Sequence, residues 1–165
     1  MTGKTQQAGQ LTAALKEEFK ELIGHYPEQR AALIPALHRC QEDLGGWLSP
    51  EVLEELAGLF GMEPVEVYGV ASFYPMFHLK PVGEHVIGVC HNISCSLRGA
   101  EDLLQEVCEA TGCEKPGATS ADGKYTVLRL ECQGTCVNAP MFDLDGVFHE
   151  NIGAGDVQRI LEATK

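Results

Sequence analysis

The chain has 165 residues, of which 44% are hydrophobic and 22% are charged, as in ordinary globular proteins. Its net charge of −12 argues against a surface that binds nucleic acid or anionic lipid. No stretch approaches the roughly 18 uninterrupted apolar residues of a membrane span, and the polar N-terminus lacks the apolar core of a secretory signal. We therefore expect a cytoplasmic protein that neither binds nucleic acid nor inserts directly into a membrane.

Residues 1–80 are predicted to be helical. Apolar residues recur at helical spacing over residues 11–23, and they do so again over residues 28–44. Pro35 lies within the second of these segments, where it indicates either a kink or a late helix start, because proline has no backbone N–H to donate. The pattern leaves both alternatives open.

The next two helices have clear N-termini. Ser49 is a suitable N-cap and is followed by Pro50 at the first helical position, and Gly61 ends the segment. A fourth helix is expected from Pro64. We assign the aromatic run at its end, residues 73–77, to the core rather than to a docking surface. The four helices together predict an N-terminal helical bundle.

The pattern changes after the Lys-Pro-Val-Gly segment at residues 80–83. Short β-branched runs predict strands, and an Asp-Gly turn predicts a hairpin. The expected elements are, in order, a strand at 85–90, a helix at 99–111, a strand at 124–131, a hairpin at 141–149 and a helix at 156–163. We therefore expect an α/β protein with two domains, a helical bundle over residues 1–80 and a β-α-β-β-α domain over residues 81–165.

Seven cysteines are many for a chain of this length. Because their number is odd and no export signal precedes them, metal binding or redox chemistry is expected rather than a disulfide framework. Cys90 ends the first predicted strand and Cys95 follows it, while Cys132 ends the second predicted strand and Cys136 follows that. If the two strands are parallel neighbours joined by a helical crossover, both loops leave the sheet at one edge and the four thiolates converge.

Four converging thiolates suit either a tetrahedral zinc ion or a [2Fe–2S] cluster. Structural zinc sites typically use C-x2-C pairs, whereas the spacings here are C-x4-C and C-x3-C. The wider spacing favours the two-iron cluster and leaves zinc as an alternative. His91, beside Cys90, is not expected to be a ligand, since four cysteines suffice. Cys40 and Cys108 fall on apolar helix faces and are expected to pack in the core, while Cys113 is expected to be structural or exposed.

Two stretches carry a more specific pattern. They are Val89-Cys90 with Cys95-Ser96-Leu97-Arg98-Gly99-Ala100, and Glu131-Cys132-Gln133-Gly134-Thr135-Cys136-Val137-Asn138-Ala139-Pro140. Shorter matching stretches lie at residues 26–27, 41–47, 70–74 and 80–83. With these stretches the chain, from about residue 20 to its C-terminus, resembles the small thioredoxin-fold [2Fe–2S] subunit of respiratory NADH dehydrogenase (complex I). This family also supplies subunits of NAD-reducing hydrogenases and NAD-dependent formate dehydrogenases, which are the alternative assemblies.

The resemblance implies a thioredoxin-like fold for residues 81–165. It implies a [2Fe–2S] cluster ligated by Cys90, Cys95, Cys132 and Cys136. It also implies electron transfer beside a flavoprotein subunit that binds NADH and FMN, with other iron–sulfur subunits in the same complex, at the periphery of the membrane. No Gly-x-Gly-x-x-Gly or P-loop pattern occurs in the chain, so no complete active site is expected on it alone. Gln133 and Thr135 stand where the family often has Leu and Ala, and both can adjust hydrogen bonding near the cluster.

Two other function classes serve as alternatives. A thiol–disulfide oxidoreductase would share the β-α-β-β-α order, and Ala139-Pro140 stands where a thioredoxin fold often carries a cis-proline. That activity uses a C-x2-C pair at a helix N-terminus, however, and no two cysteines of this chain have that spacing. A zinc-stabilised adaptor fits the spacing but not the resemblance. We also expect part of the helical surface to bind the flavoprotein, since the helices have more apolar faces than a small bundle needs.

Overall fold

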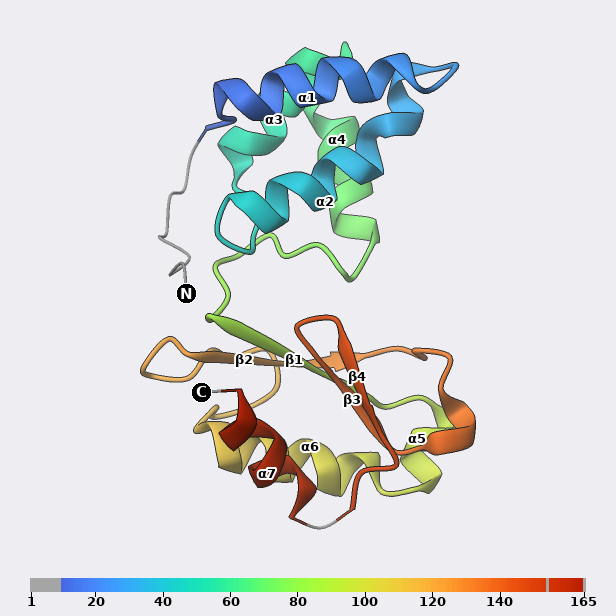
Figure 1. The fold of residues 1–165 in the computed structure, drawn as a ribbon, viewed down its shortest axis with the longest axis vertical. Coiled ribbons are helices and arrows are strands. Elements are labelled where there is room, and N and C mark those ends of the chain that lie inside the picture. The colour runs from blue at the N-terminus through green and yellow to red at the C-terminus, as the bar shows by residue number, and fades with distance from the viewer. Residues whose placement is uncertain (1–9, 154, 165) are drawn as a thin grey trace. The chain divides into compact units, whose positions relative to one another are not determined.

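The computed structural model describes residues 10–153 and 155–164. This part of the chain forms two compact units, a helical unit that ends at Pro81 and a sheet-containing unit that begins at Val82 (Figure 1). The helical unit comprises α1 (Ala13–Gly24), a 3-10 turn (Gln29–Ala32), α2 (Leu33–Asp43), α3 (Pro50–Phe60) and α4 (Pro64–Phe73). The second unit comprises β1 (His85–Cys90), α5 (Ile93–Leu97), α6 (Ala100–Thr111), β2 (Tyr125–Leu130), a 3-10 turn (Cys136–Asn138), β3 (Met141–Leu144), β4 (Val147–Glu150) and α7 (Asp156–Ala163). The predicted α/β fold class is confirmed. None of the helices in the described residues has the length and apolar character needed to cross a membrane.

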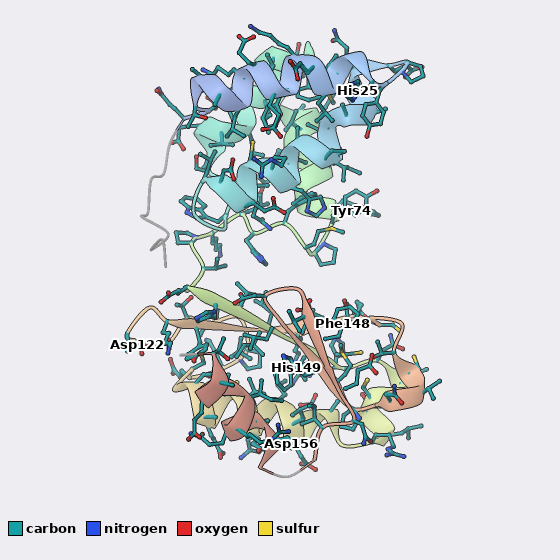
Figure 2. The ribbon with its side chains drawn as sticks, viewed as in Figure 1. His25, Tyr74, Asp122, Phe148, His149 and Asp156 are labelled. Atoms are coloured by element: carbon teal, nitrogen blue, oxygen red, sulfur yellow. The ribbon has the colours of Figure 1, made fainter. Side chains whose placement is uncertain are left out.

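Local sequence signals set the helix ends. The hydroxyls of Thr12 and Ser49 each accept a hydrogen bond from the backbone N–H three residues ahead, which caps α1 and α3. At their C-terminal ends, His25 is the C-cap of α1 and Tyr74 is the C-cap of α4 (Figure 2). Pro35 falls in the first turn of α2, where backbone N–H groups have no intrahelical partner. It therefore belongs to a late helix start and not to a kink.

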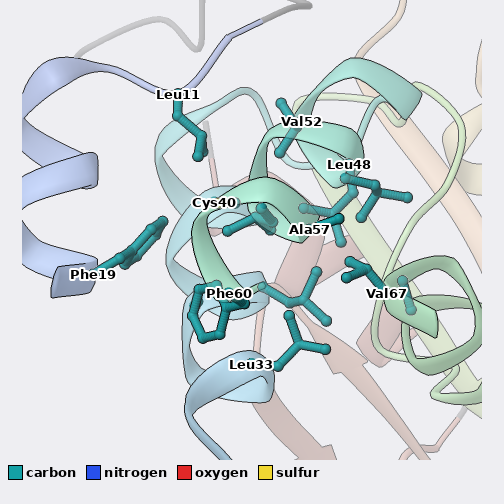
Figure 3. Packing of buried hydrophobic residues seen from close by; sticks show 14 of the residues in the cluster. Leu11, Phe19, Leu33, Cys40, Leu48, Val52, Ala57, Phe60 and Val67 are labelled. Atoms are coloured by element: carbon teal, nitrogen blue, oxygen red, sulfur yellow. The ribbon is translucent and has the colours of Figure 1, made fainter. Parts of the chain in front are cut away.

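The four helices of the first unit share one hydrophobic core (Figure 3). Its fully buried side chains come from all four helices and include Phe19 of α1, Leu37 of α2, Phe60 of α3 and Val67 of α4. Burying a side chain of this size contributes about 1.5–3 kcal/mol relative to leaving it exposed. The apolar helix faces are thus the main source of stability in this unit.

The aromatic run at the end of α4 divides between core and surface. Phe77 is buried, whereas Phe73 is 77% exposed and Met76 is 47% exposed. The prediction that the whole run lies in the core is therefore wrong for Phe73 and Met76. Val67 and Ala71 turn one side of α4 toward the core. A residue two positions after Ala71 lies on the opposite side of the helix, because successive residues are rotated by about 100°.

The sheet of the second unit has the strand order β2-β1-β3-β4. β1 and β2 are parallel, with Cys90 paired to Leu130, while β3 is antiparallel to both β1 and β4. α6 and α7 lie side by side on one face of this sheet (Figure 1) and enclose the second hydrophobic core with it. The strands predicted at 85–90 and 124–131 and the hairpin predicted at 141–149 are confirmed to within one residue at each end.

Candidate metal centre

The ends of β1 and β2 bring the four candidate cysteines to one edge of the sheet. Cys90 is the last residue of β1 and pairs with Leu130, the last residue of β2, so that Cys132 follows two residues later. Cys95 lies in the short helix α5, and Cys136 begins the 3-10 turn after β2. Because parallel neighbours end at the same edge of a sheet, the loops that carry the cysteines leave it side by side.

The cysteines lie as two pairs. The sulfur atoms of Cys132 and Cys136 are 3.5 Å apart, and both residues are exposed. A tetrahedral metal with metal–sulfur bonds of about 2.3 Å holds two sulfur atoms about 3.8 Å apart. This pair therefore needs little adjustment to bind one metal. Cys90 and Cys95 form the other pair, which is buried in a small apolar cluster.

The two pairs are close enough to influence each other. The pKa of the Cys95 thiol is raised to about 11, first by burial, next by the neighbouring Cys90, and to a smaller extent by Cys136 of the other pair. Among the described residues, no three His, Cys, Asp or Glu side chains are gathered closely enough to hold a single metal ion. The structure thus brings the candidate ligands together as two dithiol pairs, and this donor set fits a cluster with two cysteines on each iron.

Hydrogen-bond donors lie beside the exposed pair. The backbone N–H of Gly134, whose φ is 82°, donates to the sulfur of Cys132 at 3.4 Å. The hydroxyl oxygen of Thr135 is buried and has no hydrogen-bond partner in the described part of the chain. Such a group costs about 1–3 kcal/mol, which a sulfur acceptor would reduce. Gln133 instead donates one N–H of its side-chain amide to the carbonyl of Glu131 at 3.0 Å.

Exposed apolar side chains surround the cysteine loops. Ile93 and Leu97 of α5 are 74% and 83% exposed, and Val137, next to Cys136, is 97% exposed. We refer to Ile93, Leu97 and Val137 as the apolar rim. Periodicity in the sequence could not reveal it, because single apolar residues in short loops form no repeating pattern. Exposed apolar residues that gather at one place are typical of an interaction site.

The other candidate residues have different surroundings. His91 faces Glu131, with 3.7 Å between its Nε2 and the carboxylate Oε1. Cys40 is buried in the helical core, where burial raises the pKa of its thiol to about 12. Cys108 and Cys113 are both buried in the core of the second unit, so Cys113 is not exposed. All three cysteines outside the two pairs are core residues.

Comparison with known families distinguishes a zinc site from a cluster. The family described as thioredoxin-like [2Fe-2S] ferredoxin matches residues 19–165. The chain belongs to this family. The resemblance inferred from the cysteine-containing stretches is thereby confirmed, as is the thioredoxin-like fold of the second unit. Membership of the thioredoxin-like [2Fe-2S] ferredoxins supports an iron–sulfur cluster as the cofactor rather than zinc.

Similar proteins of this family belong to NADH dehydrogenases. A subunit of NADH-quinone oxidoreductase from Rhizobium meliloti is 38% identical over 149 residues, which are 90% of this chain and 88% of that protein. A subunit of NADH-quinone oxidoreductase from Thermus thermophilus is 41% identical over 133 residues, 79% of this chain and 72% of that protein. Among solved structures, an NAD+-reducing [NiFe]-hydrogenase in the H2-reduced state superposes with a TM-score of 0.67 at 26% identity. The match covers 79% of this chain but only 21% of the hydrogenase chain.

Proposed function

We propose that this chain is the subunit of an NADH:quinone oxidoreductase that carries one [2Fe–2S] cluster and exchanges single electrons with the FMN of an NADH-oxidising flavoprotein subunit. The proposed ligands are Cys90, Cys95, Cys132 and Cys136. The observation that carries the proposal is the arrangement of these cysteines as two pairs at the adjacent ends of β1 and β2. NAD(H) and FMN would bind to the partner only, and other iron–sulfur subunits of the complex would exchange electrons beyond it. The complex would hold the chain at the cytoplasmic periphery of a membrane.

The residues around the proposed ligands have defined tasks in this proposal. When bound, a [2Fe–2S] cluster accepts and returns one electron at a time. The N–H of Gly134 donates to the sulfur of Cys132, and the Thr135 hydroxyl, from the loop between Cys132 and Cys136, is buried. Donors to sulfur stabilise added negative charge, so both groups would favour the reduced state. Burial of Cys90 and Cys95 keeps water from one side of the site.

We further propose that the flavoprotein contacts the apolar rim. The rim residues Ile93, Leu97 and Val137 lie within two residues of the cysteines, so a partner seated there would come close to the proposed cluster. Contact between apolar side chains would also exclude water from the path of the electron. The partner's matching surface is therefore expected to be apolar.

The helical unit has a second exposed apolar surface, on α4. Val65 and Phe73 are exposed on the side of the helix away from Val67 and Ala71, and Tyr68 is exposed on its flank. Three exposed large apolar residues on one helix do not stabilise an isolated chain. Such a group of residues is typical of an interaction site. We propose that this face of α4 also binds the flavoprotein.

A subunit of an NAD+-reducing hydrogenase is the second candidate function, and the superposition with a hydrogenase chain supports it. The support is weaker than for NADH:quinone oxidoreductase, because the identity is 26% against 38% and the hydrogenase chain is several times longer. Purification of the native complex distinguishes the two. Reduction of NAD+ by hydrogen gas would favour the hydrogenase, and reduction of a quinone by NADH would favour the proposal.

Reduction by NADH through the flavoprotein subunit tests the proposed electron transfer. The chain is mixed anaerobically with the purified flavoprotein subunit, NADH is added, and the EPR signal of the reduced cluster is followed over time. We expect the signal to appear only when NADH and the flavoprotein are both present. A cluster that dithionite reduces, but that NADH and the flavoprotein together leave oxidised, would contradict the proposal.

A matched pair of variants tests the proposed contact at the apolar rim. Val137→Asp places a charge in the rim, whereas Val147→Asp places the same charge on β4, at another exposed valine of the second unit. We expect Val137→Asp to slow reduction by NADH at least about tenfold, because burying one unpaired charge costs more than about 1.4 kcal/mol. Val147→Asp is expected to leave the rate unchanged. Equal rates in the two variants would exclude the rim as the contact.

A further inference from the structure

Two cysteines meet at the C-terminal end of α6, away from the proposed ligands. The helix ends at Thr111, and Gly112 takes the left-handed conformation with a φ of 71°. The N–H of Cys113 donates to the carbonyl of Cys108 at 3.0 Å, and the N–H of Gly112 donates to the carbonyl of Glu109. These two bonds define a Schellman motif, which turns the chain back over the last helical turn and typically brings the first and sixth residues into contact.

The hydrogen bond limits how far apart the two cysteines can be. With N–Cα about 1.46 Å and Cα to carbonyl oxygen about 2.4 Å, a 3.0 Å bond keeps the two Cα atoms within about 7 Å of each other even if all the atoms lie on one line. Bending at the carbonyl shortens the separation further. Disulfides form at Cα separations of about 4.4–6.8 Å, so the backbone of Cys108 and Cys113 already has a suitable geometry.

The surroundings of the two thiols agree with a close pair. Cys108 is 9% exposed and Cys113 is 5% exposed, and both belong to the core cluster of the second unit. The pKa of Cys108 is raised, first by burial and next by the nearby Cys113. The Sγ of Cys113 donates to the carbonyl of Tyr125 at 3.5 Å, which holds it against the start of β2. The proposed electron-transfer function uses neither thiol.

We propose that Cys108 and Cys113 form a reversible disulfide by exchange with a low-molecular-weight disulfide. One protein thiolate attacks a sulfur of that disulfide, which forms a mixed disulfide and releases one thiolate. The second protein thiolate then attacks the protein sulfur of the mixed disulfide, which closes the ring and releases the other thiolate. The protein loses two electrons and two protons, and the small disulfide is reduced to two thiols.

This site is separate from the proposed cluster. Ala100, at the start of α6, packs with Cys90 and Cys95. Cys108 lies eight residues further along the helix, about 12 Å at 1.5 Å per residue. Oxidation of the pair is therefore expected to leave iron binding intact, and the proposal stands or falls independently of the cluster.

Peptide mapping tests the proposal directly. The full chain is equilibrated with mixtures of oxidised and reduced glutathione, quenched with acid, alkylated and digested with trypsin. Residues 99–124 form one tryptic peptide that contains only Cys108 and Cys113, because the Lys115-Pro116 bond resists trypsin. In the oxidised mixtures we expect the mass of this peptide to be two hydrogens lower, and we expect the peptide to carry neither the alkylating group nor glutathione. In the reduced mixtures we expect both thiols to be recovered and alkylated. Cys40, a single buried cysteine, serves as the control that stays alkylatable.

Two results would overturn the proposal. One is a peptide that keeps two free thiols, or carries only bound glutathione, in mixtures that oxidise other dithiols. The other is an equal affinity of wild type and Cys108→Ser for phenylarsine oxide at this peptide.

Phenylarsine oxide binds two neighbouring thiols at once, and the second thiol acts at high effective concentration. We therefore expect Cys108→Ser to weaken the binding of phenylarsine oxide to this peptide by at least about tenfold relative to wild type. Cys40→Ser is expected to leave that binding unchanged. Equal capture by wild type and Cys108→Ser would show that the thiols are not paired.

Discussion

Leu130 of β2 fills the space that a β-carbon on Gly88 of β1 would need. Such an atom would lie only 2.6 Å from the Cγ of Leu130 and closer still to one of its methyl groups. Each residue lies two positions before a proposed ligand: Gly88 before Cys90, and Leu130 before Cys132. The Leu130 side chain thus covers Gly88 at the ends of the two parallel strands that lead into the cysteine loops.

Gly88→Ala is therefore expected to lower both stability and cluster content. The added methyl group forces Leu130 or the strand itself to move, at a cost of about 1–3 kcal/mol in the free energy of unfolding. Denaturant unfolding followed by circular dichroism measures the loss, and an iron assay measures cluster content. The double variant Gly88→Ala/Leu130→Ala should recover part of both.

A glycine elsewhere provides the control for this substitution. A β-carbon added to Gly58 in α3 would meet no atom within 4 Å, so Gly58→Ala is expected to stabilise the chain by about 0.5–1 kcal/mol through its helix propensity. If Gly88→Ala proved as stable as wild type, the Leu130 side chain would not be fixed in the space beside Gly88.

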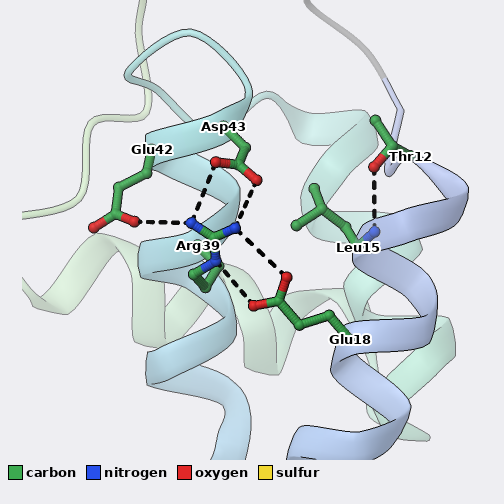
Figure 4. A network of polar contacts seen from close by, with 6 residues as sticks. All are labelled: Thr12, Leu15, Glu18, Arg39, Glu42 and Asp43. Carbon is green, nitrogen blue, oxygen red and sulfur yellow. Dashed lines mark hydrogen bonds and ion pairs between the residues drawn. The ribbon is translucent and has the colours of Figure 1, made fainter.

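Arg39 of α2 is expected to stabilise the helical unit through three carboxylates. It contacts Glu18 of α1 at 2.9 Å, Glu42 at 3.2 Å and Asp43 at 2.9 Å (Figure 4). Arg39→Ala leaves these like charges together and should cost about 1 kcal/mol, since the side chains are partly exposed. Arg39→Lys should recover only part of this stability, because lysine keeps the positive charge but cannot form the same forked hydrogen bonds.

Urea unfolding monitored by the fluorescence of Trp47, the chain's single tryptophan, measures the effect in this unit. The loss in Arg39→Ala should shrink in about 1 M salt, where exposed charges are screened. Lys20→Ala, which removes a cation paired with the exposed Glu17, should cost less than about 0.5 kcal/mol. A loss in Arg39→Ala that does not change with salt would contradict an electrostatic origin.

Two aspartates of the second unit should respond to pH with opposite signs. Burial raises the pKa of Asp143. At Asp122, which Figure 2 labels, the Ser120 hydroxyl and then the Lys124 N–H lower the pKa. The folded chain thus disfavours ionised Asp143 and favours ionised Asp122. The pKa of Asp143 in the unfolded chain is about 3.9, and its pKa in the folded chain is higher. The free energy of unfolding should therefore fall as pH rises from the unfolded pKa through the folded pKa. Asp122 should contribute stability above its unfolded pKa and lose it as pH falls through its lower folded pKa.

Thermal unfolding of Asp143→Asn and Asp122→Asn between about pH 3 and pH 7 checks these signs. At neutral pH, Asp143→Asn is expected to unfold at a higher temperature than wild type and Asp122→Asn at a lower one. Both differences should shrink toward the acid end. Shifts of the same sign at neutral pH would show that one of the two environments is wrongly described.

Thr135 is expected to adjust the reduction potential of the proposed cluster. Its buried hydroxyl has no partner within the described residues, and Thr135 lies in the loop between Cys132 and Cys136, so we expect a sulfur of the proposed cluster to accept its hydrogen bond. Thr135→Val removes the donor at nearly constant volume and should lower the midpoint potential, because the reduced state loses a stabilising hydrogen bond. Thr135→Ser keeps the donor and should stay close to wild type. An EPR-monitored redox titration compares them, and equal potentials in all three proteins would contradict this role.

Much of the second unit could be predicted from sequence because its signals are local. The β-branched run at 85–90, the Asp-Gly turn in the hairpin and the glycines around α6 each act within a few residues. The predicted ends of the two strands indicated where the cysteine pairs lie, because β-branched runs distinguish strands from the loops that follow them. These signals do not depend on distant contacts.

Other features depend on contacts that a sequence pattern does not contain. The five-residue helix α5 is too short to show a helical period, so periodicity does not predict it. The exposure of Phe73 follows from which side of α4 packs on the core. The 3.5 Å approach of the Cys132 and Cys136 sulfurs depends on the loop between them, in which Gly134 adopts a positive φ. The backbone hydrogen bond from Cys113 to Cys108 follows in the same way from the left-handed turn at Gly112.

The binding of one [2Fe–2S] cluster by the two cysteine pairs is tested most directly by EPR of the dithionite-reduced chain, with iron and acid-labile sulfide assayed in the same sample. We predict a spin-½ signal, two irons and two sulfides per chain. The signal should be lost or altered by serine at Cys90, Cys95, Cys132 or Cys136 but retained by serine at Cys40. A colourless, EPR-silent chain containing zinc, or an iron content that none of the four serine substitutions changes, would contradict the proposed cluster.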